Sequence, residues 1–344
     1  MISKARLEFP DSLKGLAVLL MIQVHITELF VRNENYESFF GKTSLFLGGI
    51  PAAPVFMLAM GYFLAYGKKS PSKIAWRGFR LFFGGILLNV GLNAHLLYNI
   101  LFKGWQFNAW HYIFGVDILP LAGLSLVFIA FINRVLPSKT LIYFGLAIAA
   151  ALVSEFFHPL QFEENTFKYI LAFFIGGTSF AYFPLFPWIA YPLLGYGFNK
   201  LLLQMPEIKF RNVKYFAAAG LTGLFLLVTI NFGFNISVNL TAYYHHNSMF
   251  FIWAVAFAAF WIYLLYLLEF YLNNSLFFIF LRFLGKNVTA IYVVQWLIIG
   301  NIATKLFKTQ SLIEWFFWVV GITLISSVLT YIWLKLKSKI ASKN

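Results

Sequence analysis

Ionisable side chains inside apolar segments are the residues of this sequence best suited to chemistry. His25 lies about twelve residues into the first apolar run, which at the helical rise places it roughly 18 Å from the start of that run. Asp117 enters a later run from the opposite side and reaches a similar depth. Such groups are costly in hydrocarbon, so they are kept for pairing or for function. A histidine beside a carboxylate can act as a general base or a nucleophile, and a structural pair is the alternative.

The other histidines fall on the outer side of the predicted membrane. We expect those in the outer loops to be ordinary interfacial residues: His158, His245 and His246. The adjacent His245-His246 pair lacks the i, i+4 spacing of a helical metal clip, so no metal site is predicted. Four polar residues are candidate contacts for an acceptor substrate, each with a structural role as the alternative: Asn93, His95, His111 and Gln295.

Positive charge suited to phosphates lies on the opposite, inner side. Lys73, Arg77 and Arg80 share one helix face at i, i+4 and i+7. The guanidinium fork matches phosphate geometry, whereas the positive-inside rule and anionic lipid head groups also explain such a stripe. At the start of the first run, Asp11 is expected to cap the helix N-terminus and to pair with Lys14.

We predict that the protein that positions these residues is an all-α integral membrane protein. Of 344 residues, 61% are apolar, 21% are aromatic and only 11% are charged, which is too little charge to cover a water-soluble globule. Long apolar runs recur throughout, so one polytopic domain over 1–344 is expected. About ten transmembrane helices are predicted, near 13–31, 44–66, 79–100, 113–132, 140–157, 184–203, 215–233, 250–272, 287–304 and 312–334.

The segment around 169–203 breaks the membrane pattern. Pro184, Pro187 and Pro192 fall within nine residues and cannot lie in an undisturbed helix. The apolar run before them, 169–183, is too short to span alone, so we predict a proline-broken or re-entrant segment that is buried in protein or lines a cavity. A simple proline kink is the alternative.

The distribution of charge predicts the orientation in the membrane. The net charge is +14, and 20 of the 26 basic residues fall on one side of the predicted spans. This asymmetry indicates that both termini are cytoplasmic, and we expect a bacterial inner membrane. Because the basic residues follow the predicted spans, we expect them to face the lipid bilayer and expect no nucleic acid as partner. The absence of cysteine excludes thiol catalysis and disulfides.

Several motifs, in order along most of the chain, carry a family resemblance. The first run opens with Asp11-Ser12-Leu13-Lys14-Gly15-Leu16-Ala17 and continues through Met21 to His25. Later motifs are Pro54-Val55-Phe56-Met57 to Gly61, Arg77-Gly78-Phe79-Arg80, Phe183-Pro184-Leu185-Phe186-Pro187-Trp188, and Leu284-Gly285-Lys286-Asn287 to Tyr292 and Gln295. The pattern resembles the transmembrane acyltransferases and is most similar to the heparan-α-glucosaminide N-acetyltransferase-like catalytic family, a relative of acyltransferase family 3.

The resemblance implies that acetyl-CoA or another acyl-CoA is held from the cytoplasmic side and that a sugar or glycoconjugate acceptor is acylated on the far side. By position, His25 would be the catalytic histidine, and Arg77 and Arg80 would bind the CoA phosphates. Two departures leave the acceptor and the choice of O- or N-acyl transfer open: human-type heparan enzymes lack a histidine at the place of His25, and Gln295 stands where many relatives carry histidine.

Taken together, the residues and the resemblance predict a membrane-embedded acetyltransferase. His25 would act as base or nucleophile, and Asp117 would orient it or stabilise its imidazolium. Lys14 and Lys73 complete the predicted CoA-binding set. A transporter or lipid-carrier flippase is the alternative, because proline-broken spans with buried ionisable groups also describe that class. A structural membrane subunit is a third hypothesis.

Overall fold

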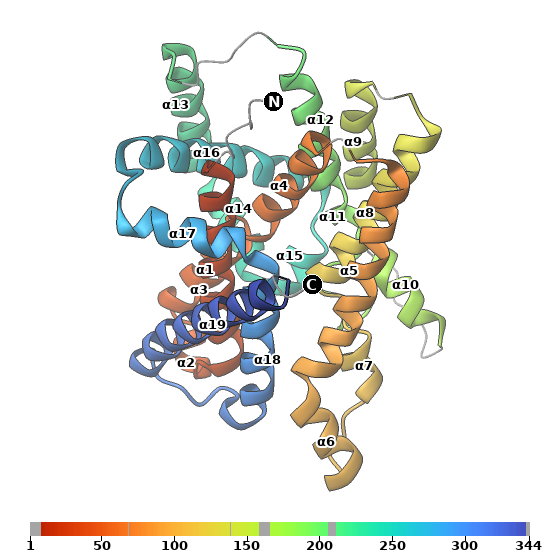
Figure 1. Ribbon diagram of the computed structural model, residues 1–344, viewed down its shortest axis with the longest axis vertical. Coiled ribbons are helices and arrows are strands. Elements are labelled where there is room, and N and C mark those ends of the chain that lie inside the picture. The colour runs from red at the N-terminus through yellow and green to blue at the C-terminus, as the bar shows by residue number, and fades with distance from the viewer. Residues whose placement is uncertain (1–7, 68, 138, 158–165, 206–210, 342–344) are drawn as a thin grey trace. The chain divides into compact units, whose positions relative to one another are not determined.

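The computed structural model describes residues 8–67, 69–137, 139–157, 166–205 and 211–341, and every regular element in these ranges is an α-helix (Figure 1). Within these ranges, strand-like backbone pairing is limited to two isolated β-bridges, Val31 with Gln310 and Val116 with Ala181. The predicted all-α class is therefore confirmed. The chain divides into two compact units.

The first unit comprises Met1–Ala52, Gly91–Gly104 and Trp261–Asn344. Its helices are α1 (Phe9–Phe30), α2 (Asn33–Tyr36), α3 (Phe39–Gly49), α6 (Ala94–Lys103), α17 (Leu276–Lys286), α18 (Val288–Leu306), α19 (Leu312–Ala341) and the second half of α16 (Ser248–Leu272).

Glycines bring α1 and α17 into close contact. A Cβ atom on Gly15 would lie 1.9 Å from the carbonyl oxygen of Leu281, and one on Gly285 would lie 1.7 Å from that of Asp11. Only glycine permits such an approach of two helix backbones. The motif that opens α1 therefore packs against the motif that ends α17.

The second unit comprises Ala53–Val90 and Trp105–Phe260. It contains α4 (Ala53–Tyr66), most of α5 (Pro71–Leu92), α7 (Ala109–Ile113), α8 (Ile118–Val135), α9 (Thr140–Phe157), α10 (Phe167–Ile175), α11 (Leu185–Trp188), α12 (Ala190–Leu202), α13 (Val213–Val228), α14 (Ile230–Val238), α15 (Leu240–Tyr244) and the first half of α16. Glycine again sets the closest packing, because a Cβ on Gly61 of α4 would lie 1.9 Å from the Pro192 carbonyl oxygen on α12.

The described residues include six helices that are long and apolar enough to cross a membrane, or eight spans if each of two bent helix pairs counts as one. The pairs are α5 with α6, bent by 58°, and α13 with α14, bent by 65°. Two of the ten predicted spans fall short of this length. The span predicted at 140–157 is the shorter apolar helix α9, and the one at 184–203 is divided between α11 and α12.

The outer faces of the long helices carry large apolar side chains. Val228 on α13 is 78% exposed and Phe317 on α19 is 67% exposed. Water would not tolerate such continuous apolar surface, whereas lipid does. The exposure therefore agrees with a membrane as the solvent.

The predicted break in the membrane pattern is present in the second unit. Helix α10 ends at Ile175 and is followed by Gly176 and Gly177, which have positive φ angles of 77° and 75°. The chain then runs beside Val116, whose N–H donates to the Phe180 carbonyl at 2.9 Å and whose carbonyl accepts from the Phe183 N–H at 2.8 Å. These bonds satisfy backbone groups that a helix would otherwise pair internally.

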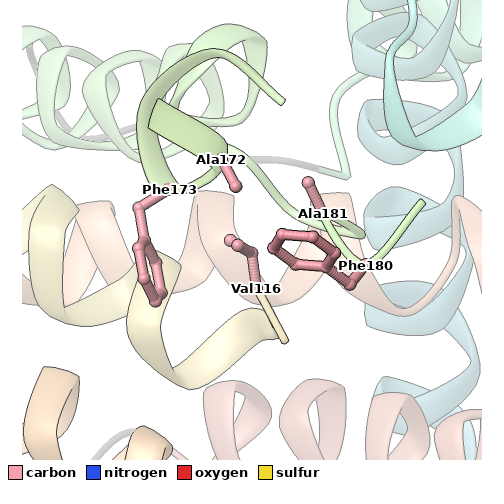
Figure 2. Packing of buried hydrophobic residues seen from close by; sticks show 5 residues of the cluster. All are labelled: Val116, Ala172, Phe173, Phe180 and Ala181. Carbon is pink, nitrogen blue, oxygen red and sulfur yellow. The ribbon is translucent and has the colours of Figure 1, made fainter. Parts of the chain in front are cut away.

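A small apolar cluster covers this irregular segment (Figure 2). The side chain of Val116 lies between the rings of Phe173 and Phe180, with Ala172 and Ala181 beside them. The segment is thus packed against protein, which is one of the two outcomes predicted for broken backbone at membrane depth.

Candidate active site

His25 lies near the C-terminal end of α1, where two consecutive residues of α18 hold its imidazole. Its Nδ1 is 3.4 Å from Oε1 of Gln295, and its ring centroid is 4.0 Å from that of Trp296, with the planes inclined by 32°. Gln295 is buried, at 1% exposure, whereas His25 and Trp296 are partly exposed. Trp296 could not be singled out from the sequence, because an indole in an apolar run is ordinary.

The contact with Gln295 determines what the imidazole can do. With the amide oxygen facing the ring, Gln295 can only accept, so Nδ1 of His25 carries the proton. Nε2 then keeps its lone pair, which a general base or a nucleophile needs. Gln295 therefore fixes the tautomer and the orientation of the ring, as a carboxylate does in a catalytic triad, without adding negative charge.

Hydrogen bonds on either side of His25 fix this part of α1 to α3 and α19. The hydroxyls of Thr27 and Ser44 are 2.6 Å apart, and the Ser44 hydroxyl also donates to the side-chain oxygen of Gln23. The indole N–H of Trp315 donates to the Thr27 hydroxyl at 2.8 Å. Because these anchors lie two residues before and two residues after His25, the imidazole is carried by a rigid stretch of helix.

Asp117 belongs to the second unit and caps α8. Its Oδ1 accepts the backbone N–H of Ile118 at 2.7 Å. It therefore precedes the helix, although we predicted that it lies a few residues inside a span. The role of Asp117 beside His25 stays a prediction, because the two residues belong to different units.

At the start of α1, the predicted pairing of Asp11 is confirmed and the predicted capping is wrong. The Lys14 ammonium lies 2.8 Å from Oδ1 of Asp11. Asp11 lies within the first turn, since the N-cap position is occupied by Glu8, which makes no side-chain cap bond. The buried Asp11 carboxylate thus serves to balance the Lys14 charge.

Next to this pair lies a buried ionic network that was not predicted from the sequence. Oε1 of Glu269 accepts from the Ser12 hydroxyl at 2.7 Å and from Arg282 at 3.0 Å. Arg282 also donates to the side chain and the backbone carbonyl of Asn273, at 2.6 and 2.8 Å. The network links α1, α16 and α17. An acidic residue near the end of the predicted 250–272 span was the signal that could have identified it.

The basic stripe of α5 has the arrangement predicted from the sequence. Lys73, Arg77 and Arg80 are all exposed, whereas Ile74 and Gly78 of the same helix are buried within the second unit. The Arg80 guanidinium lies over the Trp76 ring, 5.1 Å from its centroid. The three cations are therefore available to phosphate groups, whether these belong to a nucleotide or to lipid.

Asn93 and His95 lie at the bend between α5 and α6. Asn93 occupies the N-cap position of α6 without a side-chain cap bond. The imidazole Nδ1 of His95 makes a short hydrogen bond with the Thr304 hydroxyl on α18, and the Asn99 amide lies 3.4 Å from the same nitrogen. His95 thus contacts the helix that holds His25, and both belong to the first unit.

His111 belongs to the second unit and packs against the irregular segment after α10. Its ring stacks on Phe180 with centroids 4.7 Å apart, and its Nε2 is 3.3 Å from the side-chain amide of Asn108. These contacts hold the His111 ring in a defined orientation. They do not test its predicted role as an acceptor contact.

His246 is a buried residue, contrary to the interfacial position that we predicted. It is 2% exposed, its Nδ1 donates to the Tyr243 carbonyl at 2.8 Å, and its Nε2 accepts from the Tyr191 hydroxyl at 2.9 Å. Burial is the main cause that lowers the pKa of His246 to about 4; the backbone hydrogen bond to Tyr243 opposes this shift, and the neighbouring His245 adds to it. His245 is partly exposed and lies against Gly176, and His158 is outside the described residues.

Within the described ranges, no group of three or more His, Cys, Asp or Glu side chains could hold a metal ion.

A family model described as heparan-alpha-glucosaminide N-acetyltransferase, catalytic, matches residues 6–229, which is more than half of the chain. The chain belongs to this family. Membership confirms the resemblance seen in the motifs and indicates a membrane acetyltransferase. The matched range includes His25 and the basic stripe of α5, and it ends before Gln295 and Trp296. No curated protein and no solved structure matches the chain.

Proposed function

We propose that this chain transfers an acetyl group from acetyl-CoA to a hydroxyl or amino group of a sugar-type acceptor. The observation that carries the proposal is the contact between His25 and Gln295 within a helix of membrane-spanning length. It supports a neutral imidazole with a free Nε2 in a protein whose family performs acetyl transfer. A polar pair in this position serves either structure or chemistry, and family membership favours chemistry.

In direct transfer, Nε2 of His25 takes the proton of the acceptor hydroxyl or amine as the acceptor atom attacks the thioester carbon. The carbonyl electron pair moves to oxygen and returns as the carbon–sulfur bond breaks, and the CoA thiolate takes the proton from the imidazolium. Alternatively, Nε2 attacks the thioester carbon and the CoA thiolate leaves; the acceptor then takes the acetyl group from Nε2, and its proton passes to the thiolate.

We propose the exposed stripe of Lys73, Arg77 and Arg80 as the ligand of the CoA phosphates. Two guanidinium groups on one helix face can each bind a phosphate in a bidentate manner. Lys14 stays in the proposed set, although Asp11 competes for its ammonium group. Four residues are proposed as acceptor contacts: Asn93, His95, His111 and Gln295.

The excess of basic residues on one side of the spans supports cytoplasmic termini and a donor that enters from the cytoplasm. We propose that the acceptor is modified on the extracytoplasmic side of a bacterial inner membrane. His25 lies toward the C-terminal end of α1, which this orientation places in the outer half of the membrane.

Ligand-dependent thermal melting of the full purified chain tests the proposal, together with CoA release in the presence of amino sugars and of sugars that offer only hydroxyls. A ligand that binds only the folded state stabilises it, by about 2.7 kcal/mol at one hundred times its Kd. We expect stabilisation by acetyl-CoA and acceptor-dependent CoA release. Stabilisation by a sugar or lipid-linked sugar, with none by acetyl-CoA or CoA, would contradict the proposal and favour a transporter or flippase.

A further inference from the structure

Two buried N–H donors beside His25 have no hydrogen-bond partner within the described residues. They are Nε2 of Gln295 and Nε1 of Trp296. Both atoms are shielded from solvent, and the Gln295 side chain is 1% exposed. Buried donors are nearly always paired in folded proteins, because an unpaired one loses its bonds to water without replacement. Two such donors on consecutive residues require a physical reason.

Both donors belong to side chains that contact the imidazole. Gln295 uses its amide oxygen to accept from Nδ1 of His25, which leaves its N–H groups for another partner. Trp296 uses its ring face to pack on the imidazole, which leaves its indole N–H for another partner. The imidazole of His25 on α1 therefore contacts both side chains of α18 that carry these donors, inside the first unit.

We propose that Gln295 Nε2–H and Trp296 Nε1–H stabilise the oxyanion that forms on the acetyl carbonyl during transfer. The inference rests on the proposed function and assigns two further catalytic residues to it. As the acceptor attacks, the carbonyl π pair moves to oxygen, and the two N–H groups bond to the resulting negative charge. When the carbonyl re-forms, the carbon–sulfur bond breaks and the CoA thiolate takes the proton held by His25.

The chemistry of the two donors suits this role. Each is neutral, so it can stay buried between turnovers at a lower cost than an arginine or a lysine. In a region of low dielectric, fixed neutral dipoles stabilise a new negative charge strongly, because they need not reorganise when it appears. Neither donor is required to orient His25, since the Gln295 oxygen and the Trp296 ring already do so.

Trp296→Phe tests the proposal, because phenylalanine keeps an aromatic ring against His25 and removes only the N–H. We expect turnover to fall about 100-fold, the scale measured for the loss of one oxyanion donor, with little change in stabilisation by acetyl-CoA. Trp318→Phe is the matched control, since its indole N–H already donates to Gln310 at 2.8 Å. The control should keep its turnover per folded molecule.

Gln295→Glu provides a second variant if Trp296→Phe does not fold. A glutamate keeps an oxygen that accepts from His25 and lacks the N–H donor, so its turnover should also fall at least tenfold. Wild-type turnover in either folded variant would overturn the oxyanion assignment and leave the proposed function intact. Absence of transfer and of acetyl-CoA stabilisation in the wild-type chain would instead refute the proposed function, and this inference with it.

Discussion

The backbone N–H of His95 donates to Oδ1 of Asn301 at 2.8 Å, at the point where α5 bends into α6. The amide Nδ2 of the same Asn301 donates to the Gly91 carbonyl at 2.9 Å. In an unbroken helix the N–H of residue 95 would bond to the carbonyl of residue 91. The Asn301 carboxamide thus bridges two backbone groups that the 58° bend separates, and it fixes His95 to α18.

Replacing Asn301 should therefore destabilise the bend. Asn301→Ala leaves the His95 N–H and the Gly91 carbonyl without their bridging partner, and we expect a loss of about 1–3 kcal/mol in the free energy of unfolding. Ser327→Ala is a suitable control, because Ser327 bonds only to a carbonyl of its own helix. Denaturant unfolding in mild detergent measures both. Equally small losses of unfolding free energy in the two variants would show that the Asn301 bridge does not stabilise the bend.

Arg282 is expected to be the most sensitive charged residue of the first unit. Arg282→Met leaves the Glu269 carboxylate buried without its cation, and breaking a buried pair from one side costs about 3–5 kcal/mol. Removing both charges in Arg282→Met with Glu269→Leu should recover most of this loss. A double-mutant cycle on thermal or denaturant unfolding measures the coupling. Additive losses in the double variant would contradict a direct ion pair.

The buried His246 predicts a loss of stability in acid. Its pKa is about 4 in the folded chain and about 6.5 when unfolded, so below pH 6.5 the unfolded state binds more protons. The stabilising effect of the neutral imidazole is complete above pH 6.5. It decreases as the pH falls toward 4, by up to about 3 kcal/mol. Unfolding between pH 7 and pH 4.5 should show this slope, and it should flatten in His246→Gln. An unchanged slope in that variant would assign the effect to other groups.

The basic stripe should determine donor affinity. Arg77→Ala or Arg80→Ala removes a charge-assisted hydrogen bond, and we expect CoA binding to weaken by about 1–3 kcal/mol. Dephospho-CoA should lose less affinity than CoA in whichever variant lacks the ligand of the 3′-phosphate. Arg134→Ala is a control, since Arg134 is an exposed cation outside the stripe. If CoA binds both stripe variants as tightly as the wild type, these arginines serve the lipid surface.

The sequence predicted which segments are helical better than it predicted the number of spans. Apolar periodicity and length determine that α1, α8, α16, α18 and α19 are helices of membrane-spanning length. The bends near Asn93 and Thr229 were not predicted, because neither contains the proline that usually signals a kink. The opposite holds near Pro187, where prolines correctly predicted irregular backbone.

The importance of His25 could be predicted from its type and depth, but its partner could not. Asp117 was a reasonable choice because a carboxylate is the usual companion of a catalytic histidine. The partner in the structure is Gln295, which lies 270 residues away on α18. Such a contact depends on which helices pack together and in which rotation, and a single sequence carries little information on either. The same reason explains why Trp296 and Glu269 were missed.

The most direct test of the account is the turnover of His25→Ala, measured beside its thermal stabilisation by acetyl-CoA. If Nε2 of His25 performs the proton transfer or the nucleophilic attack, the purified variant should stay folded and still be stabilised by acetyl-CoA. Its transfer rate should fall by a factor of about 100 or more, the contribution of a positioned acid–base group. A folded His25→Ala protein that transfers acetyl groups at a rate near that of the wild type would contradict the account.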